Sequence, residues 1–71
     1  GTGVSDFISG LDTFDLTLTK AVTGQTQTSL TYYQAGEAQS PFGADSGTRL
    51  VLSGGTIVDF FGTKVVQSDI T

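Results

Sequence analysis

The chain has 71 residues, a formal net charge of −4 at pH 7, and neither cysteine nor histidine. A chain of this length forms one small domain that buries only about 60% of its unfolded surface. Its composition excludes both disulfides and the Cys/His metal sites that stabilise many small proteins. The three basic residues, Lys20, Arg49 and Lys64, are scattered along the sequence. We therefore expect no nucleic-acid partner, because phosphate binding needs clustered lysine and arginine.

The sequence also lacks membrane and N-terminal export signals. No apolar run approaches the roughly 18 residues of a membrane span, so we expect no membrane insertion. The sequence begins Gly1-Thr2-Gly3, without an initiator methionine and without the charged region that opens a signal peptide. We therefore expect residues 1–71 to be a single β domain that is a fragment or a processed part of a larger protein. An export signal at the C-terminus would escape this N-terminal test.

Residues 13–20 alternate in polarity along their length. Phe14, Leu16 and Leu18 share one side, and threonine or aspartate occupies the positions between them. A period of two with polar residues outward predicts a half-buried strand. Gly24 follows as a candidate turn residue.

Residues 26–33 are rich in threonine and tyrosine and predict a second strand. A helix over residues 28–39 is the alternative, in which Leu30, Tyr33 and Ala38 share a face. The β-branched threonines and a glycine disfavour that helix. Residues 34–47 contain three glycines, the single proline and an Asp-Ser-Gly turn signal, so we expect a loop there.

Two apolar, β-branched runs, residues 48–53 and 56–61, flank Gly54-Gly55. A Gly-Gly pair between two such runs predicts a hairpin with a type I′ turn, which requires a positive φ at both central residues. Gly62-Thr63 then turns the chain into a short predicted strand over residues 64–67. Together these signals predict an all-β fold, a small antiparallel sandwich or half-barrel of about five strands.

Two segments resemble parts of a family of exported proteins. Residues 6–16 follow the pattern D-F-x-x-G-x-D-x-x-D-L, which is similar to the segment after the last calcium repeats in RTX proteins exported by type I secretion. Residues 48–58, Gly62-Thr63 and residues 67–71 resemble the closing strands of such C-terminal modules, which commonly end a few residues after a Ser-Asp step such as Ser68-Asp69. The two matches stand in the same order as in the family and cover about half the chain.

This resemblance implies a non-catalytic C-terminal module of an exported bacterial protein. Its implied roles are to cap a β-roll, to aid folding outside the cell and to carry the type I secretion signal. Its implied location is extracellular or at the bacterial cell surface. The implied partner is the preceding β-roll, because such a roll ends in an open edge of unpaired backbone groups that must be covered.

Calcium is the ligand that the resemblance suggests, although we expect no cofactor to be required. The RTX nonapeptide G-G-x-G-x-D-x-U-x binds Ca²⁺. Residues 54–61 match its two leading glycines and place Asp59 at its aspartate, but Ile57 replaces the third glycine. Residues 1–6 match the repeat less well. The tandem calcium array of the family is therefore absent from this sequence.

Three further carboxylates, Asp6, Asp12 and Asp15, could gather around one ion. Ca²⁺ takes six to eight oxygen ligands, so carbonyls or water would have to supply most of them. The alternative is that Asp6 and Asp12 cap turns and that Asp15 faces solvent from the first strand. Together with Asp59, these residues form the candidate metal ligands.

Catalytic signals are weak, and we expect the protein not to be an enzyme. Without histidine or cysteine, the usual general base and thiolate nucleophile are missing, and an activated serine needs a neighbouring base. The composition alone permits a carboxylate pair for glycoside hydrolysis. A sheet of 71 residues, however, has little room for a cleft.

Tyr32-Tyr33 and Phe60-Phe61 are adjacent aromatic pairs. In a strand, one member of each pair faces the core and the other faces out. An outward Tyr33 or Phe61 would contact a sugar, a peptide or a neighbouring subunit. The alternative is that both faces of the sheet are covered.

A second resemblance gives an alternative function. Leu50-Val51-Leu52, Gly54-Gly55 and Phe60-Phe61-Gly62 lie in an order of strand, loop and hairpin that is similar to part of a phage tail-tube protein, over residues 10–66. This resemblance implies an oligomeric assembly subunit of a virion. Sheet edges and the outward aromatics would then form the contacts with neighbouring subunits.

Overall fold

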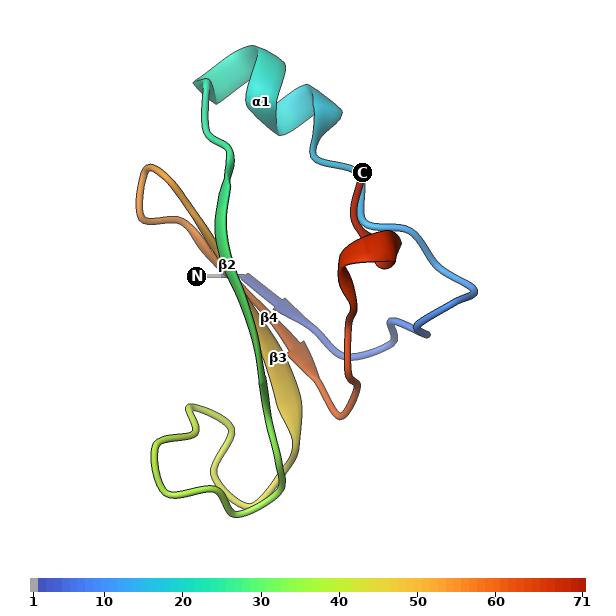
Figure 1. Ribbon diagram of the computed structural model, residues 1–71, viewed down its shortest axis with the longest axis vertical. Coiled ribbons are helices and arrows are strands. Elements are labelled where there is room, and N and C mark those ends of the chain that lie inside the picture. The colour runs from blue at the N-terminus through green and yellow to red at the C-terminus, as the bar shows by residue number, and fades with distance from the viewer. Residues whose placement is uncertain (1) are drawn as a thin grey trace.

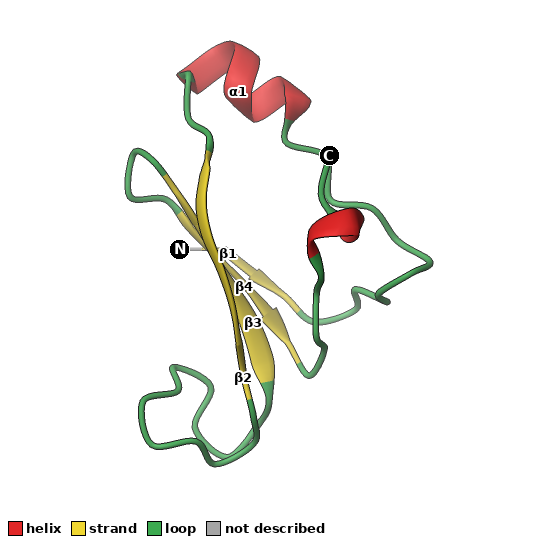
Figure 2. Cartoon of the chain, in the orientation of Figure 1, coloured by secondary structure: helices red, strands yellow, loops and turns green. Residues whose placement is uncertain are grey.

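The computed structural model describes residues 2–71, which form one open sheet with a short helix beyond one end (Figures 1 and 2). In the sheet the strand order is β1-β4-β3-β2; β1 runs parallel to β4, and the other neighbours are antiparallel. The all-β prediction is confirmed. The elements follow in the order β1 (Thr2–Val4), α1 (Thr17–Thr23), β2 (Gln27–Tyr33), β3 (Gly47–Leu52), β4 (Ile57–Phe61) and the 3₁₀ turn η1 (Gln67–Asp69).

The finer prediction, an antiparallel sandwich or half-barrel of about five strands, is not confirmed. Residues 2–71 hold a single sheet of four strands, and one of its pairings is parallel. Two largely irregular segments, residues 5–16 and 62–71, cover one face of this sheet in place of a second sheet (Figure 1). Within residues 2–71 there is no helix with the length and apolarity that a membrane span requires.

The predicted strand over residues 13–20 is wrong, because this part of the chain enters helix α1. Phe14 forms a single β-bridge with Ile70 and no longer ladder follows. The Asp15 carboxylate accepts the Thr17 backbone N–H at 2.8 Å and so supports the first helical turn. Phe14 and Leu16 pack against the core, as the alternation predicts, whereas Leu18 on the helix is 74% exposed.

The predicted strand over residues 64–67 is also absent. Both sides of β4 are occupied, by β1 and β3, so the chain after β4 finds no neighbouring edge with which to pair. It turns at Gly62, where φ is 73°, and crosses the core face of the sheet. There Val65 is buried and donates its backbone N–H to Thr48 Oγ1 at 2.9 Å.

Strand β2 agrees with the sequence prediction, and the helix considered for residues 28–39 does not form. Residues 34–46 form the predicted loop between β2 and β3. The register with β3 shifts between Gln27 and Ser29, which marks a β-bulge at the start of the strand. The rest of β2 pairs regularly along its length.

The hydrophobic core lies on one face of the sheet. On this face Thr48 is opposite Phe60, which is fully buried and meets Phe7 and Phe14 edge-on at centroid distances of 5.1 and 5.2 Å. The irregular segments therefore supply the Phe7 and Phe14 rings that pack on Phe60 over the core face of the sheet. The other buried core residues are Leu50, Leu52, Val58, Val65 and Ile70, with Val4, Leu16 and Leu30 partly buried against them.

The β3–β4 hairpin forms where it was predicted, but its turn is not type I′. The Leu52 C=O accepts the Gly55 N–H, and the Leu52 N–H donates to the Thr56 C=O, both at 2.9 Å. Gly55 has a φ of 90°, whereas the φ of Gly54 is not positive. This arrangement is typical of a three-residue loop, a type I turn followed by a left-handed residue in a bulge. In this turn, therefore, Gly55 needs the conformational freedom of glycine and Gly54 does not.

We expect Gly55→Val to lower the free energy of unfolding by about 1–3 kcal/mol and Gly55→Asn to cost less, because asparagine tolerates the left-handed region and a β-branched residue does not. Thermal unfolding of both variants checks this. Gly54→Ala is the matched control with a small expected effect, since its Cβ would meet mainly the flexible Gln25 amide, 2.6 Å away. Equally mild effects of asparagine and valine would contradict the left-handed assignment of Gly55.

Candidate functional site

The sheet face opposite the core, which we call the outer face, carries an aromatic cluster. Tyr33, Gly47 and Phe61 lie side by side on β2, β3 and β4. Phe42, from the loop after β2, packs over this row and is buried. Its ring lies 5.2 Å from that of Phe61, edge-on, and 6.1 Å from that of Tyr33. The cluster thus joins the loop to three strands.

Gly47 makes this cluster sterically feasible. A Cβ at that position would lie 2.6 Å from the Phe42 ring, closer than any carbon pair can approach without movement. Phe61 remains 42% exposed at the border of the cluster, and Tyr33 is half-buried. Both side chains therefore lie on the outer face as predicted. Their role in binding a partner stays a prediction.

An ion pair occupies the middle of the outer face. Arg49 on β3 is opposite Asp59 on β4, and its guanidinium donates from Nε at 2.8 Å and from Nη2 at 2.9 Å to the two carboxylate oxygens. The hydrogen bond to Asp59 raises the pKa of Arg49. Such a bidentate pair fixes both side chains on the sheet surface. The Asp59 carboxylate is therefore engaged with a cation of the chain itself.

The candidate metal ligands do not come together. Asp12 accepts the Ile8 backbone N–H at 2.8 Å, and Asp15 accepts that of Thr17, which lowers the pKa of Asp15 together with the Thr17 side chain. Asp6 is exposed in a bend. Among residues 2–71 no group of three or more acidic side chains is placed to hold a metal ion. Asp12 caps a turn, as the alternative interpretation predicts. Asp15 lies at the start of helix α1 and not on a strand.

We expect millimolar Ca²⁺ to raise the melting temperature of chelator-treated protein by only about a degree or two, as weak sites would. The reason is that the carboxylates of Asp12, Asp15 and Asp59 already serve the fold. Thermal unfolding with and without the ion measures the effect. A large stabilisation that saturates at micromolar calcium would contradict this prediction and would require ligands to regroup around the ion.

Sequence reasoning missed the structural role of Asp69, which ties together the two ends of the chain. Its buried carboxylate accepts the Ser9 hydroxyl at 2.6 Å, the Gly10 N–H at 2.9 Å and the Val66 N–H at 3.0 Å. These bonds, led by that from Ser9, lower the pKa of Asp69 below its ordinary value of 3.8. The only sequence signal for this contact is the Ser-Asp step near the C-terminus.

The bonds to Asp69 predict an acid-sensitive stability. Because its folded-state pKa is lowered, the carboxylate contributes fully above the ordinary value of 3.8, and the contribution is lost as pH falls through the folded-state pKa. We expect the melting temperature of the wild type to fall more steeply than that of Asp69→Asn between about pH 6 and about pH 2.

Two further variants locate that effect. Ser9→Ala removes the largest cause of the low pKa and should move the acid transition to higher pH. Ser5→Ala is its control, because Ser5 is an exposed serine like Ser9 but is not among the hydrogen-bond partners of Asp69. Identical pH profiles for the wild type and Asp69→Asn would contradict the proposed role of this carboxylate.

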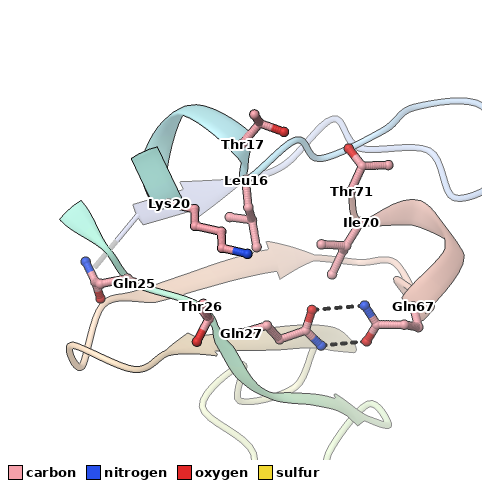
Figure 3. Close-up of a pocket in the computed structure, with 9 residues that line it drawn as sticks. All are labelled: Leu16, Thr17, Lys20, Gln25, Thr26, Gln27, Gln67, Ile70 and Thr71. Atoms are coloured by element: carbon pink, nitrogen blue, oxygen red, sulfur yellow. Dashed lines mark hydrogen bonds between the residues drawn. The ribbon is translucent and has the colours of Figure 1, made fainter. Parts of the chain in front are cut away.

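A groove of about 400 Å³ lies between α1, the start of β2 and the C-terminal segment (Figure 3). Its floor includes Leu16 and Ile70, and one wall is closed by Gln27 and Gln67, whose amides exchange hydrogen bonds of 2.6 and 3.0 Å. Lys20 extends from α1 into this space (Figure 3) and is the only ionisable side chain in the lining. The remaining lining residues of the groove are Thr17, Gln25, Thr26 and Thr71.

No protein family, curated protein or solved structure matches this chain.

Proposed function

We propose that this chain is a non-catalytic C-terminal module of an exported bacterial protein, which caps a β-roll and has a folding and secretion role outside the cell. The observation that carries this proposal is the position of β1. It lies at an edge of the sheet, and it is parallel to β4. A capping module needs such a strand, because the strands of a β-roll are parallel and its last edge must be continued or covered.

The path of the chain supports this role. The three residues of β1 pair in parallel with Val58, Asp59 and Phe60 of β4. The next two pairings in the sheet, of β4 with β3 and of β3 with β2, are antiparallel. The pairing therefore changes from parallel to antiparallel at β4, the second strand of the sheet counted from the β1 edge. A change of this kind ends a parallel array, since the next strand in the sheet no longer repeats the direction of the first.

Contacts between the two segments that resemble RTX modules also support the proposal. Phe14 donates its N–H to the Asp69 C=O at 2.8 Å and accepts the Thr71 N–H at 3.0 Å. Leu16 donates to the Thr71 C=O at 2.7 Å. Residues 6–16 and the C-terminal residues thus fold as one unit, as parts of a common module would. A non-catalytic role is consistent with carboxylates that serve the ion pair, the turns and the Asp69 contact.

Hydrogen exchange tests the capping role. Amides of β1 should exchange rapidly in the isolated 71-residue chain and should be protected in the longer parent protein, because a roll would then cover the β1 edge. Amides of β3, which is central in both, are the internal control. Equal exchange of β1 in the two proteins would overturn the proposal.

Export tests the secretion role separately. A passenger protein fused before residues 1–71 should leave cells that carry a type I exporter, and the same fusion without residues 67–71 should stay inside. The control is a fusion that carries Asp69→Asn, which keeps the length of the C-terminal segment. Equal export of the passenger alone and of the full fusion would contradict the role.

The alternative function is a structural assembly subunit, similar to a phage tail-tube protein and located in a virion. The specific observation in its favour is the second sheet edge, β2, together with the exposed Phe61 on the outer face. Rings or stacked rings in electron micrographs of the purified chain would favour this alternative over the capping role.

A further inference from the structure

Strand β2 presents a long open edge. It is the longest strand and the last of the sheet, and β3 is its only neighbour in the sheet. No backbone group of residues 28–33 has a hydrogen-bond partner outside the β2–β3 ladder in the part of the chain that the structure describes. Backbone N–H and C=O groups along this edge are therefore free to pair with another strand.

The devices that usually protect such an edge are missing from most of β2. Proteins protect edge strands with lysine, proline, short length or a bulge, whereas residues 27–33 read Gln-Thr-Ser-Leu-Thr-Tyr-Tyr and contain no charge and no proline. The bulge lies between Gln27 and Ser29 and leaves a regular stretch from Ser29 to Tyr33. The middle residue of that stretch is Thr31, which is exposed.

Charge is arranged around β2 in a way that suits a second copy. All the acidic residues lie outside β2, so self-pairing would not bring like charges together on the strand. The helix before β2 carries Lys20, and the loop after β2 carries Glu37 and Asp45. Lys64, whose Nζ lies 5.3 Å from the centroid of the Tyr32 ring, offsets one of these two negative charges at the loop end, which keeps a net negative charge. An antiparallel pair of β2 strands sets the helix end of each copy toward the loop end of the other, so opposite charges face each other.

We propose that two copies of this chain pair antiparallel through β2, with Thr31 on the two-fold axis, to join their four-stranded sheets into one. In this register Thr31 meets its own counterpart, Leu30 meets Tyr32 of the other copy on the core face, and Ser29 meets Tyr33 on the outer face. Aliphatic–aromatic and Thr–Thr cross-strand pairs are favourable. A register centred on Leu30 would instead bring the bulge into the contact.

The pairing closes on itself. A two-fold contact uses the same surface on both copies, so it ends at a dimer rather than a filament. The edges that remain are the two β1 strands, each of only three residues. The inference is independent of the capping role, which uses the β1 edge.

The test measures mass in solution by light scattering and sedimentation over a range of concentrations. The wild type should change from the 7.3 kDa monomer toward twice that mass at submillimolar concentration, because a single strand edge is a small interface. Thr31→Lys and Thr31→Glu should each stay monomeric, since like charges would meet on the axis. An equimolar mixture of the two variants should dimerise again.

Matched controls and the contrary outcomes complete the test. Thr13→Lys and Thr13→Glu place the same charges on an exposed residue away from β2 and should dimerise like the wild type; circular dichroism verifies that all variants fold. A monomeric wild type at about 1 mM, dimers of either Thr31 variant alone, or no recovery in the mixture would each overturn the proposal. Assemblies larger than a dimer would overturn the closed pairing and favour the assembly alternative.

Discussion

Phe60→Ala is expected to unfold the module or to leave it barely folded at room temperature. Phe60 is fully buried, and its ring is the common partner of Phe7 and Phe14. Removing a buried phenylalanine costs about 3–5 kcal/mol. A domain of 71 residues has a free energy of unfolding of roughly 4–11 kcal/mol, at about 0.05–0.15 kcal/mol per residue. Chemical denaturation followed by circular dichroism measures the loss.

The neighbouring residue supplies the control for that experiment. Phe61 is 42% exposed on the outer face and contacts Phe42, so Phe61→Ala should cost only about 1–2 kcal/mol. The two substitutions remove the same atoms from adjacent positions on opposite faces. If both variants lost the same stability, the assignment of the two faces of β4 would be wrong.

Thr48→Val is expected to lower the free energy of unfolding by about 2–4 kcal/mol, although valine has nearly the same shape as threonine. Thr48 is buried, and its hydroxyl donates to the Thr63 C=O at 2.8 Å and accepts the Val65 N–H at 2.9 Å. Valine leaves the buried Val65 N–H and the partly buried Thr63 C=O without this partner, and each unsatisfied buried group costs about 1–3 kcal/mol. Urea denaturation measures the change.

Thr48→Ser distinguishes the hydroxyl from the methyl group. Serine keeps both hydrogen bonds and loses one methyl, so the expected cost is about 1 kcal/mol. Thr13→Val is a second control, because Thr13 is exposed and the same change there should be nearly neutral. A larger loss with serine than with valine at position 48 would contradict the proposed role of the hydroxyl.

The elements that local sequence predicted well are those with near neighbours in sequence. The β3–β4 hairpin has two β-branched runs joined by glycines, and its pairing partner lies within the same stretch of chain. Strand β2 and the loop after it follow from threonine and tyrosine content and from turn residues. Phe60 and Phe61 face opposite sides of the sheet as the period of two requires.

The errors concern segments whose partners are distant in sequence. Residues 13–20 have the alternation of a strand, yet a strand persists only where another edge pairs with it, and Ile70 offers one bridge. After that bridge, the hydrogen bond from the Thr17 N–H to the Asp15 carboxylate supports the start of a short helix. Gly24, with a φ of 74°, ends the helix. Residues 64–67 do not form the predicted strand for a related reason. Both edges of the preceding strand, β4, are already paired, with β1 and β3.

The features of the candidate sites also separate into those that local sequence predicts and those that only the tertiary structure decides. Composition alone establishes a small acidic chain without disulfides or histidine, and local patterns establish its hairpin, the strand β2 and the outward direction of Phe61. That β2 lies at an edge follows only from the strand order of the sheet. Only the tertiary structure places the Phe42 ring over Gly47 and against the rings of Tyr33 and Phe61. Only it brings Asp69 to Ser9 and Gly10, which lie 60 and 59 residues away in the sequence. Hydrophobic burial and local turns act over a few residues and can be read from sequence, whereas the pairing of distant segments depends on which edges and cavities the rest of the chain leaves unfilled.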